Sequence, residues 1–92
     1  MKKVYKCVLV SKTELCPGIF DFVVKAPEIS ELAEIGQFLH INCGGKTLLR
    51  RPISICDFGD GLVRFAFQVK GEGTQELAKR EVGEMLDIMG PL

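Results

Sequence analysis

Short runs of apolar and β-branched residues recur along the whole chain, each about the length of one strand. Glycine, proline and aspartate separate these runs, as in Cys16-Pro17-Gly18 and Phe58-Gly59-Asp60-Gly61. This pattern is typical of a chain that folds back on itself in short antiparallel strands. It predicts six strands, at residues 4–10, 19–24, 36–43, 52–57, 62–69 and 85–89.

Only one segment has a clear helical pattern. It covers residues 75–80 and lies between the last two predicted strands. Residues 28–36 (EISELAEIG) are predicted to be irregular, or at most a single helical turn, because Gly36 interrupts them before a stable helix can form. Residues 44–46 (GGK) are predicted to form a turn.

Six short strands with one late helix predict an all-β fold, a six-stranded antiparallel Greek-key barrel. A barrel is favoured over a sandwich because closure removes exposed strand edges, which a small chain can hardly cover. With 92 residues, 47% hydrophobic and 26% charged, the chain is expected to form one packed domain over residues 1–92.

The balance of charges argues against nucleic acid and anionic membranes as partners. Twelve basic residues balance twelve acidic ones, so no general attraction to nucleic acid or to an anionic membrane is expected. No apolar run approaches the roughly 20 residues that span a bilayer, and the first residues lack a signal-peptide pattern. We therefore expect a cytoplasmic protein.

The cysteines and the single histidine give little sign of a metal site. Cys7, Cys16, Cys43 and Cys56 are scattered, with no C-x-x-C pair, and His40 has no second histidine to join it. We interpret the cysteines as small strand residues and predict neither a metal nor an iron-sulfur site.

The first candidate site is the doubled arginine in LLRRPISICD. Pro52 is predicted to mark where a strand enters the sheet, which leaves Arg51 at the mouth of that strand. Strand alternation places Arg51 and Ile53 on one side and Ser54 on the other. A guanidinium beside a flat apolar surface suits a ligand with an anionic end and a planar ring. The alternative is that both arginines are solvated and prevent another strand from pairing with this edge. We retain that interpretation for Arg50.

The second candidate site is the segment KGEGTQELAKR. Gly71 and Gly73 permit a positive φ and a close backbone approach, and the helix that follows offers unpaired N–H groups and the positive end of its dipole. Thr74 is expected either to cap the helix or to bind a phosphate. The alternative is a simple strand-to-helix turn. The segment is neither a P-loop nor a dinucleotide fingerprint of the βαβ type.

Together, in this order, the two segments resemble the motifs of a known family. Arg51-Pro52-Ile53-Ser54 is similar to an Arg-x-Tyr-Ser strand motif, and residues 67–74 to an aromatic-basic-Val-x-Gly-x-Gly-Thr motif. Gly36-Gln37-Phe38 resembles part of a Pro-Gly-Gln-Phe turn. The whole chain thus resembles the FAD-binding barrel of the ferredoxin reductase superfamily, most closely that of the electron-transfer subunit of NAD-dependent bacterial dihydroorotate dehydrogenase.

This resemblance implies FAD as the cofactor and assigns roles to individual residues. Arg51 would pair with the pyrophosphate, and Gly73 and Thr74 would hold it at the helix start. The flavin ring and ribityl chain would be lined by Pro52, Ile53 and Ser54, and the cofactor flanked by Ala66, Phe67 and Gln68. Ile53 replaces the usual tyrosine, and Gln68 stands where a basic residue is common.

The resemblance also implies a function. The barrel would belong to an oxidoreductase component of pyrimidine biosynthesis that relays electrons between NAD and its partner, the dihydroorotate dehydrogenase catalytic subunit. The family's NAD-binding and iron-sulfur domains have no counterpart in the 92 residues, so the barrel alone is expected to be inactive and to hold no catalytic residue. Two alternatives stay open: the small-subunit flavin domain of an NADPH:ferredoxin oxidoreductase, and a flavin-free interaction barrel. An exposed apolar patch could also support a homodimer.

Overall fold

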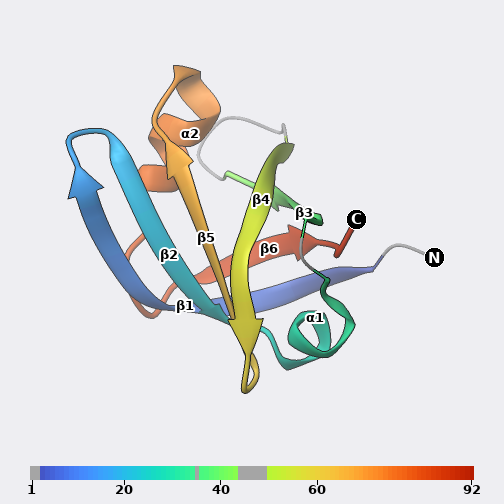
Figure 1. Cartoon of the computed structure of the whole chain (residues 1–92). Coiled ribbons are helices and arrows are strands. Elements are labelled where there is room, and N and C mark those ends of the chain that lie inside the picture. Colours follow the sequence, from blue (N-terminus) through green and yellow to red (C-terminus); the bar gives the residue numbers. More distant parts are fainter. Residues whose placement is uncertain (1–2, 35, 44–49) are drawn as a thin grey trace.

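The protein is a closed antiparallel barrel whose strands follow the order β1-β2-β5-β4-β3-β6 (Figure 1). This computed structural model describes residues 3–34, 36–43 and 50–92, so the predicted turn at 44–46 lies outside the described residues. The prediction of a six-stranded Greek-key barrel is confirmed. The elements are β1 (Val4–Cys16), β2 (Ile19–Lys25), α1 (Pro27–Leu32), β3 (Phe38–Asn42), β4 (Arg50–Gly59), β5 (Leu62–Gln68), α2 (Gly71–Ala78) and β6 (Met85–Met89).

Strand β1 continues well beyond the predicted run. Its first half pairs with β6, and from Val8 onward it pairs with β2 as far as Cys16. A register shift between Leu9 and Ser11 bends the strand where it changes partners. Such a bulge increases the local twist and helps one strand serve two neighbours around a barrel. The sequence pattern alone missed this extension because the second half of β1 is largely polar.

The core consists of inward-facing side chains from all six strands. Alternate residues point into the barrel, as expected for the period of two in a strand. Phe22, Phe65, Leu39, Ile41 and Ile88 are fully buried and fill its centre. Burial of this apolar surface is the main favourable term that holds a domain of this size together.

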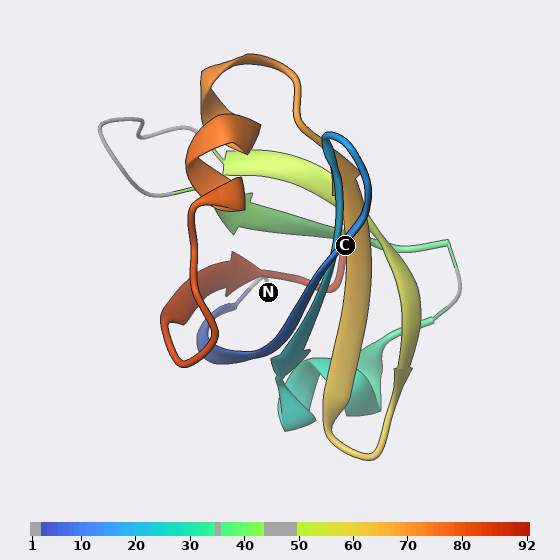
Figure 2. The same ribbon diagram turned by 90° about the vertical axis from the view of Figure 1, so that its left-hand side faces the viewer.

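Each end of the barrel carries one helix, and the two helices lie at opposite ends in both views (Figures 1 and 2). The first, α1, has six residues with Pro27 in its first turn and buries Ile29. The segment was predicted to hold at most one helical turn. Proline is favourable at a helix start because its N–H would be unpaired there anyway, and this explains a helix slightly longer than predicted.

The second helix, α2, closes the other end of the barrel with the fully buried side chain of Leu77. It was predicted at residues 75–80 but begins four residues earlier, at Gly71. Gly71 adopts a positive φ of 74°. The chain therefore turns sharply just after β5, and the whole Gly-Glu-Gly-Thr sequence becomes the first turn of the helix.

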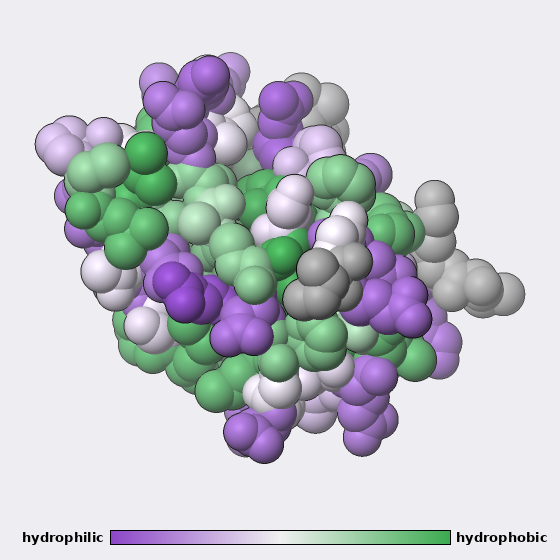
Figure 3. All heavy atoms as spheres, viewed as in Figure 1, coloured by the Kyte–Doolittle hydropathy of each residue, from purple (hydrophilic) through white to green (hydrophobic). Residues whose placement is uncertain are grey.

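The surface mixes polar and apolar side chains. Figure 3 shows an apolar area at the tip of the β1–β2 hairpin, where Leu15 is 53% exposed. Within residues 3–34, 36–43 and 50–92, no helix is long and apolar enough to cross a membrane.

Candidate functional site

A groove of about 290 Å³ runs between the first half of β4, the end of β5 and the start of α2. These three segments lie at the same end of the barrel (Figure 1). The groove is lined by Arg51, Pro52, Ile53, Ser54, Ala66, Phe67, Gln68, Lys70 and Thr74. Every residue predicted to bind the cofactor is in this set except Gly73, which packs directly behind Arg51. Two motifs about 20 residues apart in sequence thus form one site.

The first half of β4 presents its side chains as the alternation predicted. Arg51 pairs with Ile41 and Ile53 pairs with Leu39, and both partners are fully buried, so Arg51 and Ile53 lie on the core-facing side. Ser54 lies on the opposite face. Because Arg51 stands at the end of the barrel, the residue is exposed although its strand position faces inward.

Arg51 packs against the first turn of α2. A Cβ atom added to Gly73 would lie 3.2 Å from Cγ and 3.3 Å from Cδ of Arg51, and 3.6 Å from Sγ of the buried Cys43. The two glycines therefore serve different purposes. Gly71 supplies the positive φ, and Gly73 supplies the close approach that lets the arginine stem lie on the helix.

Thr74 closes the first turn of α2 from inside the helix. It was expected either to cap the helix or to bind a phosphate. The N-cap residue is Lys70, and Thr74 is the fourth helical residue. Its Oγ1 accepts a hydrogen bond from the Lys70 N–H and donates one to the Lys70 carbonyl oxygen, both at 2.6 Å. The side chain is largely buried. Thr74 thus fixes the position of Lys70.

Lys70 is the groove residue that the sequence analysis missed. Its exposed side chain makes no hydrogen bond or ion pair with any described residue, and it enters the groove beside the uncharged Gln68. Its position before Gly71 was visible in the sequence. Lys70 becomes part of the groove wall, and not of a linker, because α2 begins at Gly71.

The wall formed by β5 is held by aromatic packing. Phe67 lies edge-on to Phe22 with ring centroids 5.0 Å apart and stacks on Phe20 at 5.9 Å. Such arrangements stabilise beyond the area they bury. Phe67 is therefore fixed on its inner side while its outer edge contributes to the groove.

The groove concentrates positive charge in a chain whose formal net charge is zero. Arg51 and Lys70 are its charged lining residues, and no acidic side chain from the described part of the chain lines it. The guanidinium of Arg51 has no ion pair with any described residue. Two cations without carboxylate partners, beside the positive end of a helix dipole, form a site suited to an anion.

Arg50 does not have the solvated position that was predicted for it. Its guanidinium forms an ion pair with Asp87 of β6, with Nη2 and Oδ1 2.5 Å apart, and donates to the carbonyl oxygen of His40 at 3.3 Å. Asn42 of β3 pairs with Arg50 on one side and with Asp87 on the other. This register brings the two charges together across β3. Arg50 therefore links strands, and only Arg51 of the two arginines lines the groove.

The ion pair changes the acidity of Asp87. Burial raises its pKa, but hydrogen bonds from Arg50 and Lys6 outweigh that effect and hold the pKa below its usual value. Lys6 Nζ lies 3.1 Å from the Asp87 carboxylate.

The four cysteines are free thiols. Cys7 and Cys43 are buried, whereas Cys16 and Cys56 are exposed. Burial, with the charges of Glu28 and Asp87, raises the pKa of Cys7 to about 11. Burial also raises the pKa of Cys43, and the charge of Arg51 offsets only part of that effect. The buried thiols are thus poor nucleophiles.

The described residues contain no group of three or more histidine, cysteine, aspartate or glutamate side chains arranged to hold a metal.

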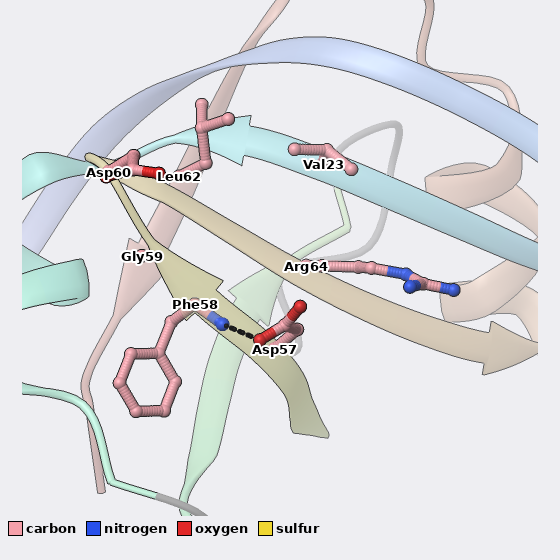
Figure 4. A pocket seen from close by; sticks show the side chains of 7 residues that line it. All are labelled: Val23, Asp57, Phe58, Gly59, Asp60, Leu62 and Arg64. Atoms are coloured by element: carbon pink, nitrogen blue, oxygen red, sulfur yellow. Dashed lines mark hydrogen bonds between the residues drawn. The ribbon is translucent and has the colours of Figure 1, made fainter.

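Another hollow, of about 270 Å³, lies outside the β4–β5 hairpin (Figure 4). Its charged lining residues are Asp57, Asp60 and Arg64. Arg64 is held by Asp21, with Nε and Oδ1 2.9 Å apart, and the Asp57 carboxylate accepts the Phe58 N–H. The single cation there already has a carboxylate partner, so this hollow lacks the free positive charge of the groove.

A larger hollow of about 470 Å³ lies between the start of β1 and the end of the chain. It is lined by Lys3, Tyr5, Leu32, Gln37, Gly90, Pro91 and Leu92. Its only charged lining residue from the described part of the chain is Lys3, so it offers less positive charge than the groove despite its size.

The chain is similar to curated electron transfer subunits of dihydroorotate dehydrogenase B (NAD(+)). The Bacillus mycoides subunit is 37% identical over 89 residues, and a Bacillus cereus subunit is 38% identical over 89 residues. Each alignment covers 92% of this chain and 34% of the relative. The chain thus spans about a third of the length of these relatives. No protein-family model matches the chain.

Solved structures share the barrel. An NADH-dependent reduced ferredoxin-NADP oxidoreductase, described for flavin-based electron bifurcation, matches with a TM-score of 0.86 and 32% identity, over 96% of this chain and 33% of that one. The ferredoxin reductase of a carbazole 1,9a-dioxygenase matches with a TM-score of 0.77 and 20% identity, over 99% of this chain and 30% of that one. The second likeness shows the fold alone.

Proposed function

We propose that this chain binds FAD in the groove. The chain belongs to the ferredoxin reductase-like barrel domains and is homologous to part of the dihydroorotate dehydrogenase B electron transfer subunits. One observation carries the proposal: Arg51 and Lys70 both line a groove at the start of α2, and no acidic residue of the described chain lines it. A pyrophosphate has two negative charges, and two cations beside helix N–H groups match it.

The residues present fit a dinucleotide of this kind. Gly73 leaves the space that a Cβ would fill beside Arg51, so the guanidinium and the backbone of α2 can approach one anion together. In this proposal Arg51 binds the pyrophosphate through its planar fork, and the N–H groups of Gly73 and Thr74 bind it from the helix. Lys70 adds a second charge that compensates for the neutral Gln68.

The remaining groove residues would position the flavin. Pro52, Ile53 and Ser54 would line the ring and the ribityl chain from β4. Ala66, Phe67 and Gln68 would form the other wall, which aromatic packing keeps rigid. When bound, the flavin supplies two-electron hydride transfer and single-electron transfer, and the protein supplies binding and orientation. We assign no general acid or base to this chain.

The wider role follows from the homology. We infer that the barrel is the flavin domain of a cytoplasmic electron transfer subunit that relays electrons between NAD and a dihydroorotate dehydrogenase catalytic subunit in pyrimidine biosynthesis. The barrel alone is expected not to oxidise NADH. A small-subunit flavin domain of a ferredoxin-NADP oxidoreductase is the second candidate, because the solved structure with a TM-score of 0.86 is that of a ferredoxin-NADP oxidoreductase. Size-exclusion chromatography would distinguish the two candidates. The FAD-loaded barrel would be mixed with a dihydroorotate dehydrogenase catalytic subunit and, separately, with the remaining subunit of a ferredoxin-NADP oxidoreductase, and complex formation measured.

FAD titration of the purified chain tests the proposed site. Binding should quench flavin fluorescence, and Arg51→Ala should weaken the affinity by roughly 10- to 100-fold, as expected for loss of a charged hydrogen bond. Lys25→Ala is the matched control, because it makes the same charge change at an exposed residue that pairs with Leu62, at the other end of β5 from the groove. Absence of binding at high FAD concentration, or equal affinities for Arg51→Ala and wild type, would contradict the proposal.

A further inference from the structure

Lys12 lies on β1, outside the groove, with only 19% of its side chain exposed. Lysine is seldom this buried without partners. The bulge between Leu9 and Ser11 explains its orientation, because after the bulge Lys12 pairs with Phe22, whose side chain is fully buried in the core. Cross-strand partners share a face, so the bulge directs Lys12 toward the inside at the end of the barrel.

The ammonium group of Lys12 holds the far end of α2. Nζ donates a hydrogen bond of 2.8 Å to the carbonyl oxygen of Ala78, the last residue of the helix, and lies 3.6 Å from the Glu81 carboxylate. A cation at this position satisfies a carbonyl that has no helical partner and interacts favourably with the helix dipole. The helix that Lys12 holds begins in the groove, where Thr74 is one of the lining residues.

The same ammonium group also contacts the aromatic packing behind the groove. Nζ lies 5.5 Å from the centroid of the Phe20 ring, within the range of a cation–π interaction. Phe20 stacks on Phe67, which lines the groove, with an angle of 22° between the ring planes. One side chain therefore supports both walls of the groove, the helix wall through Ala78 and the β5 wall through Phe20.

We propose that Lys12 is a positioning residue of the groove, which holds α2 and Phe67 at the spacing that the bound cofactor needs. The proposal rests on the function proposed above. Lys12 lies outside the groove lining and acts through Ala78 and Phe20. Its loss should therefore weaken binding of the cofactor without removing any direct contact to it.

The first test is FAD affinity in matched variants. Lys12→Met keeps the length and apolar character of the side chain but removes the cation, and it should weaken FAD affinity by about five- to tenfold. Lys12→Arg should restore affinity to within about twofold of wild type, because arginine can donate to the same carbonyl. Lys25→Met is the control, since Lys25 is an exposed residue that pairs with Leu62 at the other end of β5, and its loss changes net charge equally.

The second test does not require FAD. Amide hydrogen exchange of the ligand-free chain should be faster in α2 in Lys12→Met, including the first turn with Gly73 and Thr74, and unchanged in Lys25→Met. If wild type fails to bind FAD but this difference appears, the proposed function fails and the positioning role of Lys12 stands. Unchanged exchange in α2 would overturn that role, and so would a loss of thermal stability with unchanged FAD affinity of the folded protein.

Discussion

The backbone of Gly73 lies against the stem of the Arg51 side chain, so closely that a Cβ on Gly73 would lie 3.2 Å from the arginine Cγ. This contact joins the two sequence motifs of the groove. It brings the exposed side chain of Arg51 to the first turn of α2, where backbone N–H groups have no partner within the helix.

Gly73→Ala should separate binding from folding. Gly73 has no positive φ, and alanine favours a helix over glycine by roughly 1 kcal/mol. The new methyl group, however, must displace Arg51. We therefore expect thermal stability within a few degrees of wild type and FAD affinity about tenfold weaker. Thermal unfolding and FAD titration measure the two effects, with Gln75→Ala on the exposed face of α2 as control. Undiminished affinity would contradict the proposed role of this contact.

Lys70→Ala should weaken binding of FAD by about three- to fivefold, since an exposed charge contributes up to about 1 kcal/mol. Raising the salt concentration should shrink the difference because exposed charges are screened. Riboflavin, which has no phosphate, should bind equally to wild type and variant. Equal losses for riboflavin and FAD would show that Lys70 does not act through a phosphate.

Thr74→Val should destabilise the fold through the N-terminus of α2. Valine keeps the shape of the side chain but cannot accept the Lys70 N–H or donate to its carbonyl oxygen. We expect a loss of about 1 to 2 kcal/mol and a melting temperature lower by roughly 5 to 10 °C. Thr74→Ser keeps the hydroxyl and should retain most of the stability. Equal melting temperatures for the valine and serine variants would argue against the hydrogen bonds.

The Arg50–Asp87 ion pair should make stability depend on pH. Because the folded pKa of Asp87 is lowered, its contribution is present above the unfolded pKa of about 4 and is lost as pH falls through the folded value. Asp87→Asn should cost about 1 kcal/mol at pH 7, and the difference from wild type should shrink below about pH 4.

Urea unfolding at a series of pH values measures the Asp87 contribution. Glu31→Gln, at an exposed residue of α1 without an ion pair in the described chain, is the control and should show little difference from wild type. A difference between Asp87→Asn and wild type that stays constant down to pH 2 would refute the assigned cause.

The sequence by itself determined the fold class, and its resemblance to a known family named all the groove residues except Lys70. Strand-length apolar runs between turn residues predict six strands, and the period of two along β4 places Arg51 and Ile53 on the same side. These are local properties, because a residue's propensity and its place in an alternating pattern do not depend on distant contacts. Gly71 and Gly73 were likewise visible as residues with special backbone requirements.

Only the tertiary structure decided what each charged residue does. Arg50 and Arg51 are adjacent and chemically identical, yet the register across β3 pairs Arg50 with Asp87 and leaves Arg51 for the groove. Lys12 reaches Ala78 only because β1 bulges, and Lys70 joins the groove only because α2 starts early. Strand register, bulges and helix bounds determine which residue each charged side chain contacts. These features bring together residues that are far apart in the sequence, so the local pattern carries no information about them.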